Sequence, residues 1–137
     1  RVLDVGCALG YSTAVIAQMA GTVVGLEQDG AWARAATERL SAHGADNARV
    51  VQGPLAAGAA GHGSFDAIVV EGAVEVLPEQ LTDQLSPGGR IAAIFVEGAA
   101  GQARLGLRTP QGIAWRRIFD ATAPVLPGFA RTKAFEF

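Results

Sequence analysis

Residues 1–11 combine one acidic side chain with a run of small residues, a pattern that could hold a ligand against the protein backbone. They read as a buried strand that carries Asp4 and then turns into a helix near Tyr11. Small turn residues let a ligand approach the main chain, and the start of a helix offers unpaired N–H donors with a partial positive charge. The segment therefore predicts a site for an anionic group, formed by Gly6, Cys7, Ala8 and Gly10.

Cys7 is the only cysteine in the sequence, which excludes an internal disulfide and suits a reducing, cytoplasmic location. No histidine lies near it in sequence, so a catalytic thiol is not expected. Cys7 is expected either to lend its backbone to the ligand or to pack inertly.

The spacing of the small residues favours one class of nucleotide cofactor over another. The dinucleotide fingerprint G-x-G-x-x-G, counted from Gly6, needs a small residue where Tyr11 stands. The pattern acid-x-G-x-G-x-G fits Asp4, Gly6, Ala8 and Gly10 with one substitution. The spacing therefore favours S-adenosylmethionine (SAM), while an ordinary strand–turn–helix whose glycines only make the turn remains the alternative.

A second acidic side chain follows the next strand. Residues 22–26 form a short apolar run that ends at Glu27, and Gln28 and Asp29 lead into another helix. Ligands of open α/β sheets bind at the carboxyl ends of the strands, so this end lies beside the glycine turn. We expect Glu27 to accept hydrogen bonds from both ribose hydroxyls, with Gln28 beside it. Asp29 stands where an N-cap residue is expected.

Strands and helices alternate along the chain. Helices are expected at 11–20, 30–43 and 78–85, and further strands at 49–52, 65–70 and 90–96. Two closing strands, 103–108 and 113–119, flank the hairpin turn TPQG at 109–112. This order predicts an α/β fold, with a Rossmann-like, doubly wound, mostly parallel sheet, C-terminal antiparallel strands and three α/β/α layers. Trp32 is expected to pack in the core, with a border to adenine as the alternative.

Length and composition limit the classes of protein to consider. The 137 residues are half hydrophobic and carry a formal net charge of −2, which suits one domain with a substantial core. Neither disorder nor a basic nucleic-acid surface is indicated. The apolar runs are too short to span a membrane. His43 and His62 lack the spacing of a metal site, so no metal is expected.

The first expected strand begins at Arg1, with no methionine before it. We expect residues 1–137 to form a single domain that lacks an upstream segment. Such a segment could carry contacts to a substrate.

With these positions assigned, the chain resembles the class I SAM-dependent methyltransferases, and within them the protein-L-isoaspartate O-methyltransferase family. The resemblance covers nearly the whole chain and implies SAM as cofactor. It also implies carboxyl methylation of damaged aspartyl residues, with a protein or peptide substrate bearing isoaspartate. The motifs that carry it are VLDVG with GY at 2–11, VGLE at 24–27, FDAIVV at 65–70, LSPGGRI at 85–91 and WRRIF at 115–119.

The resemblance also implies roles for two segments that follow strands. Gly53, Pro54 and Leu55 would border the adenine, although the family has Gly-Asp-Gly there. Glu71 and Gly72 would line the sulfonium side, where the family has a small, alanine-rich loop. No residue is identified as catalytic, because a carboxylate acceptor is already nucleophilic and needs only to be held in line with the donor.

The departures from the family pattern leave other functions open. A small-molecule O- or N-methyltransferase would suit the acidic segment from Glu71 to Glu75. A SAM-binding domain without transferase activity would suit the change at 53–55, and a dinucleotide-binding module is the third alternative. The oligomeric state is not predicted.

Overall fold

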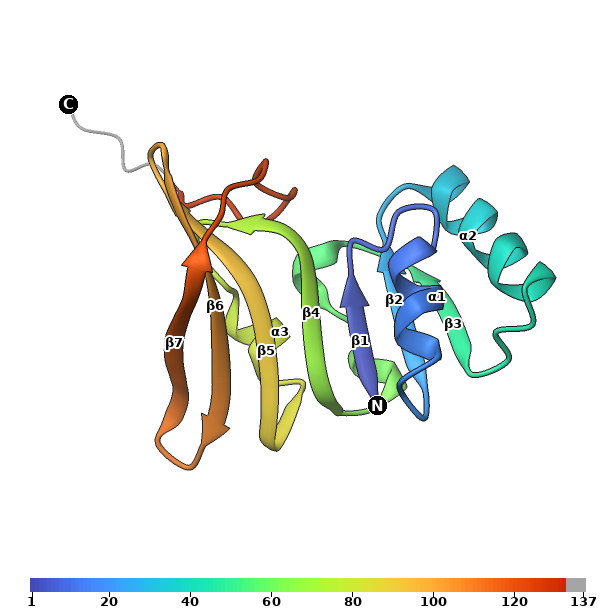
Figure 1. Ribbon diagram of the computed structural model, residues 1–137, viewed down its shortest axis with the longest axis horizontal. Helices are drawn as coiled ribbons and strands as arrows, with labels where there is room; N and C mark the ends of the chain where they lie inside the picture. Colours follow the sequence, from blue (N-terminus) through green and yellow to red (C-terminus); the bar gives the residue numbers. More distant parts are fainter. Residues whose placement is uncertain (133–137) are drawn as a thin grey trace.

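Seven strands form one mixed sheet in the order β3-β2-β1-β4-β5-β6-β7 (Figure 1). The computed structural model describes residues 1–132. The strands are β1 (Val2–Val5), β2 (Val23–Glu27), β3 (Ala48–Gln52), β4 (Phe65–Val74), β5 (Leu85–Glu97), β6 (Ala100–Thr109) and β7 (Gly112–Asp120). The helices are α1 (Tyr11–Ala17), α2 (Gly30–Ala42), α3 (Glu79–Thr82) and the short 3₁₀ turns η1 (Leu55–Ala57) and η2 (Ala60–His62).

The strands from β3 to β5 are parallel, and β6 and β7 extend the sheet as antiparallel partners. Parallel neighbours need crossover connections, which the segments containing α1, α2 and the short helices provide. The predicted fold class, a mostly parallel doubly wound sheet with C-terminal antiparallel strands, is confirmed.

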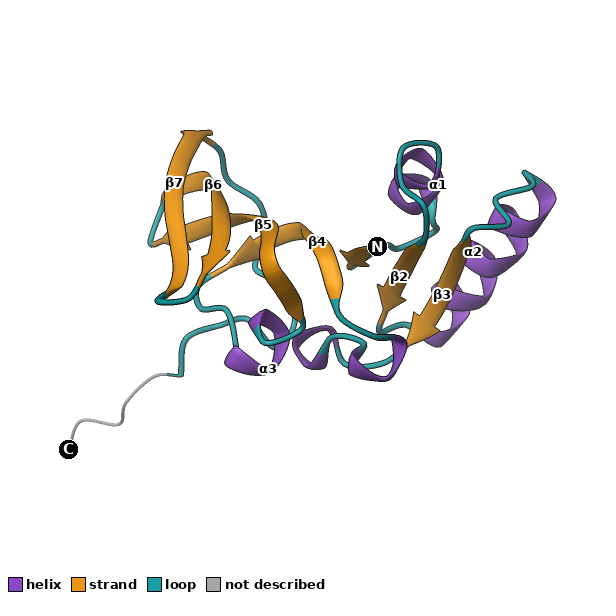
Figure 2. Ribbon diagram, turned by 90° about the horizontal axis from the view of Figure 1, so that it is seen from below, coloured by secondary structure: helices purple, strands orange, loops and turns teal. Residues whose placement is uncertain are grey.

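Side chains of the central strands alternate between the two faces of the sheet. Leu3 and Ile68 are fully buried in one core with Leu55 of η1 and Leu81 of α3. Asp4, the next residue of β1, faces the other way and contacts α1. Figure 2 shows α1 and α3 on opposite sides of the sheet. Because of this alternation, Asp4 lies on the α1 side of the sheet, whereas the adjacent apolar side chains of β1 lie in the core on the other side.

Several element bounds differ from the sequence-based expectation. Helix α1 ends at Ala17 rather than residue 20, and α3 is limited to Glu79–Thr82. Residues 71–74, expected as a loop, continue β4, whose pairing with β5 is irregular between Val69 and Ala73. The continuous apolar run stops at residue 70. The sequence pattern therefore marks the end of the regularly paired part of β4 and not the end of the strand.

Residues 124–129, which we call the returning segment, come back to the end of β4 and pair with it in parallel (Figure 1). The amide of Ala73 donates to the carbonyl of Pro124, and the amide of Leu126 donates to the carbonyl of Ala73, at 3.1 and 2.9 Å. Phe129 is fully buried, and its carbonyl accepts from the amides of Glu75 and Val76. The returning segment therefore covers the carboxyl end of β4.

Candidate ligand-binding site

Asp4 is buried where β1 meets the start of α1. Its side chain is 0% exposed, and its Oδ2 accepts from Ser12 Oγ and Thr13 Oγ1 at 2.6 and 2.8 Å. Asp4 Oδ1 has no hydrogen-bond partner in the described structure. These two hydrogen bonds join the end of β1 to the first residues of α1, across the turn that connects them. The free oxygen is unusual, because buried polar atoms are nearly always paired.

The turn after β1 depends on backbone conformations that favour glycine. Gly6, Ala8 and Gly10 have φ values of 83°, 51° and 91°. At Gly10 an added Cβ would lie 3.1 Å from the Cβ of Ala36, so the residue also lets the turn pack closely on α2. The amides of Gly6 and Cys7 donate to the carbonyl of Leu26. The amides of Ala8 and Gly10 also donate within the protein, to Glu27 and to the carbonyl of Cys7. These amides are therefore not free for the anionic group that the sequence predicts, and their main effect is on the shape of the turn.

Glu27 links the two strand ends through its carboxylate. It is 6% exposed, and its Oε1 and Oε2 accept from the amides of Ala8 and Asp29 at 2.9 and 2.8 Å. Each carboxylate oxygen can accept two hydrogen bonds, so one position on each oxygen stays free for a ligand hydroxyl. Two backbone amides thus hold a bidentate acceptor in a fixed orientation beside the turn.

A cavity of about 420 Å³ lies at this end of the sheet. Six of the predicted residues line it: Gly6, Ala8, Glu27, Gln28, Leu55 and Glu71. Four residues that the sequence did not assign to the site also line it: Asp29, Trp32, Leu126 and Pro127. The size suits a nucleoside-sized ligand, since small-molecule sites begin at about 300 Å³.

The remaining predicted residues do not line the cavity but support its wall. Cys7 is buried, with its sulfur against Gly25 of β2. The amide of Gly53 donates to the carbonyl of Glu27, and Pro54 precedes η1, which presents Leu55. At Gly72 an added Cβ would lie 2.6 Å from Leu126 Cγ. Gly72 therefore lets the returning segment approach β4.

The expectation that Trp32 packs in the core is wrong, and the expected N-cap at Asp29 is confirmed. Trp32 is 51% exposed and borders the cavity. Helical spacing could not identify the outward face because Trp32 lies in the first turn of α2. Asp29 is the N-cap of α2, and its side chain accepts from the amide of Trp32 at 3.0 Å.

The cavity is strongly acidic. Partial burial, together with the hydrogen-bonding reach and the negative charge of Asp4, raises the pKa of Glu71 to about 7. Burial also raises the pKa of the Cys7 thiol to about 11. Within residues 1–132, no Arg, Lys or His lines this cavity. The site would therefore stabilise a positively charged group.

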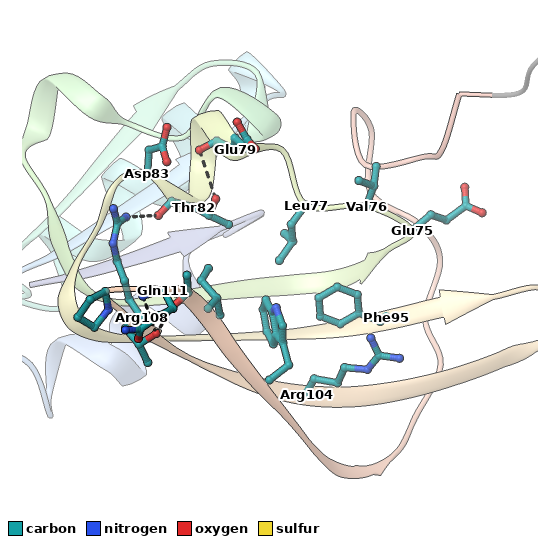
Figure 3. Close-up of a pocket in the computed structure, with 15 residues that line it drawn as sticks. Glu75, Val76, Leu77, Glu79, Thr82, Asp83, Phe95, Arg104, Arg108 and Gln111 are labelled. Carbon is teal, nitrogen blue, oxygen red and sulfur yellow. Dashed lines mark hydrogen bonds between the residues drawn. The ribbon is translucent and has the colours of Figure 1, made fainter.

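A larger cavity, of about 820 Å³, lies between α3 and the β6–β7 hairpin (Figure 3). Arg104 stacks 4.7 Å from the ring centre of Phe95, whose edge meets Trp115, and Arg108 donates to the carbonyl of Thr82. None of its lining residues lines the smaller cavity. We place the candidate site in the smaller one, because only there do the two strand-end acids and the glycine turn converge.

Within residues 1–132, no three His, Cys, Asp or Glu side chains are grouped as metal ligands. No helix there is both long enough and apolar enough to cross a membrane.

The sequence is similar to proteins of one family. The family model described as protein-L-isoaspartate(D-aspartate) O-methyltransferase (PCMT) matches residues 1–105. A protein-L-isoaspartate O-methyltransferase of Nitrobacter winogradskyi is 35% identical over 133 residues, which are 96% of this chain and 61% of that protein. One from Brucella anthropi is 39% identical over 105 residues, 77% of this chain and 48% of that protein. This chain thus spans about half to three fifths of the length of these two relatives.

Solved structures share the fold. A protein-L-isoaspartate O-methyltransferase superposes with a TM-score of 0.87 at 24% identity, over 93% of this chain and 42% of that one. A Plasmodium falciparum protein, assigned as a beta-aspartate methyltransferase (PCMT) and solved in complex with S-adenosyl-L-homocysteine, superposes with a TM-score of 0.76 at 25% identity. That match covers 92% of this chain and 65% of the other.

Proposed function

This chain belongs to the protein-L-isoaspartate(D-aspartate) O-methyltransferase family, and we propose that it forms the SAM-binding part of an enzyme that methylates carboxyl groups of damaged aspartyl residues. The observation that carries the proposal is the convergence of the glycine turn and Glu27 at one cavity, with Asp4 buried where the turn begins. The relative solved with S-adenosyl-L-homocysteine supports the choice of cofactor.

The residues present fit this cofactor. Asp4 Oδ1 is a buried acceptor without a partner, and the cationic amino group of the cofactor, directly or through water, would satisfy it. Glu27 has one free acceptor position on each oxygen, which matches the two ribose hydroxyls. The indole of Trp32 and the side chain of Leu55 offer apolar surfaces suited to a purine.

When bound, SAM supplies a methyl group on a positively charged sulfur. The chain's own contribution is to bind and orient. Glu27 holds the nucleoside end, the turn from Gly6 to Gly10 shapes the wall beside the methionine end, and Leu126 covers the cavity from the returning segment. A carboxylate acceptor needs no general base, so holding the two reactants in line and excluding water can supply much of the rate.

One observation favours a second candidate function. Glu71 lines the cavity and Glu75 follows it on the same segment. Negative charge there would disfavour an acidic acceptor and suit a neutral or cationic one. A small-molecule O- or N-methyltransferase is therefore the alternative.

The test is methyl transfer from SAM with a labelled methyl group to an isoaspartyl peptide, with the matching aspartyl peptide as control. Methyl ester on the isoaspartyl peptide alone is the expected result. Transfer to small amines or hydroxyls but to neither peptide would favour the alternative enzyme, and binding without any transfer would favour a SAM-binding domain. Preference for NAD over SAM in calorimetry would overturn the proposal.

The expected partner is a protein or peptide bearing isoaspartate, and the expected location is the cytoplasm. The location is supported by the single cysteine, which suits a reducing compartment.

A further inference from the structure

Asp4 and Glu71 lie side by side at the ends of neighbouring strands. Asp4 pairs with Val69 in the parallel β1–β4 register, and Glu71 is two residues further along β4. Gly6 is two residues beyond Asp4, and a Cβ built on Gly6 would lie 3.8 Å from the Cβ of Glu71. Gly6, which follows Asp4 on the same strand end, therefore lies against Glu71.

The other acids at the cavity already have backbone partners. Both oxygens of Glu27 accept backbone amides, and Asp29 caps α2 through the amide of Trp32. Asp4 Oδ1 and the Glu71 carboxyl are different. The first is buried without a conventional partner, and the second is within side-chain hydrogen-bonding reach of Asp4.

Two carboxylates this close cannot both be ionised cheaply, so one proton between them stabilises the pair. The other charged side chains that line the cavity are Glu27 from β2 and Asp29 at the start of α2, both acidic, and the neighbouring Cys7 thiol is neutral. In the described chain no cationic side chain of the cavity wall offsets this charge. A positively charged ligand group would take over the role of the proton.

We propose that Asp4 and Glu71 form a carboxyl pair that shares one proton in the free protein and releases it when a cationic group of the methyl donor binds. The O–H bond breaks, its electron pair stays on the carboxylate, and the proton passes to solvent. This inference rests on the proposed function, because it assigns a charge-selecting role to the same site. It makes Glu71 a specificity-determining residue for a cationic ligand.

The first test uses the ligand-free protein. Carbon-detected NMR titration of the side-chain carboxyls should show one group that titrates near pH 7 in the wild type and is missing in Glu71→Gln. Glu75→Gln is the matched control, since it removes the same charge from the same segment and should keep that titration. If every carboxyl of the wild type titrates in the ordinary acid range, the shared proton does not exist and the proposal fails.

The second test counts protons during binding. Calorimetric titration with SAM at about pH 6.5, in two buffers of different ionisation enthalpy, should show proton release by the wild type and Glu75→Gln but not by Glu71→Gln. Below the midpoint, SAM affinity of the wild type should rise about tenfold per pH unit, as one released proton requires. The affinity of Glu71→Gln should stay flat.

Ligand variants identify which positive charge replaces the proton. S-adenosylhomocysteine keeps the ammonium but lacks the sulfonium, and 5′-methylthioadenosine lacks both, so the latter should release no proton. Release with S-adenosylhomocysteine assigns the ammonium, and release with SAM alone assigns the sulfonium. SAM binding without proton release, or equal release by Glu71→Gln, overturns the proposal. If the wild type binds none of these ligands, the proposed function fails while the first test still decides whether the pair exists.

Discussion

Ala8 carries local backbone strain at the centre of the turn. Within residues 1–132 it is the one residue other than glycine with a positive φ. The left-handed conformation costs an L-residue about 1–2 kcal/mol, a cost that glycine avoids. Glycine in turn costs about 0.5–1 kcal/mol, because its unfolded chain has more conformational freedom to lose on folding. Ala8→Gly should therefore raise the free energy of unfolding by about 0.5–1 kcal/mol, measured by urea denaturation. Ala14→Gly in α1 is the control and should lower it; equal losses in both variants would contradict the strain argument.

Glu71 makes the stability of the fold depend on pH. Its pKa in the folded state, about 7, is above its ordinary value of 4.5, so the folded protein binds more protons than the unfolded one between these pH values. The free energy of unfolding therefore falls as pH rises through this window. Glu71→Gln removes the ionised group, so its Tm should exceed that of the wild type at pH 8 and match it near pH 4, below the ordinary pKa of the carboxyl. A Tm difference that is the same at both pH values would contradict this explanation.

Glu27 should matter both for ligand binding and for the local fold. Glu27→Ala removes the free acceptor positions and leaves the amides of Ala8 and Asp29 without their acceptor. Unpairing buried polar groups costs about 1–3 kcal/mol, so both the affinity for S-adenosylhomocysteine and the free energy of unfolding should fall by about this amount. Calorimetry and urea denaturation measure the two effects. Glu38→Ala on the exposed side of α2 should change neither, and an unchanged affinity in Glu27→Ala would remove the residue from the site.

The returning segment shapes the cavity at the level of elements. Leu126 packs where a Cβ on Gly72 would stand, 2.6 Å from Leu126 Cγ. Gly72→Ala should displace Leu126, lower the free energy of unfolding by about 1–3 kcal/mol, and weaken binding of S-adenosylhomocysteine. Gly21→Ala is the matched control, because nothing lies within 4 Å of its added Cβ. Similar behaviour of the two variants would show that the contact with Leu126 is unimportant.

The sequence predicted those elements whose signal is local. An apolar strand, a glycine turn and an N-cap at Asp29 are short patterns, and each is confirmed where it was expected. The returning segment has no periodicity, since its residues are fixed by hydrogen bonds to a strand some fifty positions earlier. The exposure of Trp32 and the pairing of Asp4 with Glu71 likewise depend on tertiary contacts. Contacts between distant segments are therefore the part of the site that sequence patterns could not give.

The candidate site and the larger cavity lie in different parts of the sheet. The acids and the turn of the candidate site come from β1, β2, β4 and the segments that follow them. The larger cavity is lined mainly by α3, β5, β6 and β7, and its aromatic pair comes from β5 and β7. In that pair, the Phe95 and Trp115 rings meet edge to face at 4.9 Å. The strand order keeps β1 and β2 away from the β6–β7 hairpin, because β4 and β5 lie between them.

This division predicts that stability and cofactor binding can be changed independently. Trp115→Ala removes the aromatic contact with Phe95, and since Trp115 is only partly buried, the free energy of unfolding should fall by about 1–3 kcal/mol. The affinity for S-adenosylhomocysteine should stay within about twofold, because mutations at distant sites with no shared partners act independently. Glu27→Ala is the comparison, since it should lower the affinity. A large loss of affinity in Trp115→Ala at a temperature where the variant is folded would mean that the hairpin and the cofactor end of the sheet are coupled.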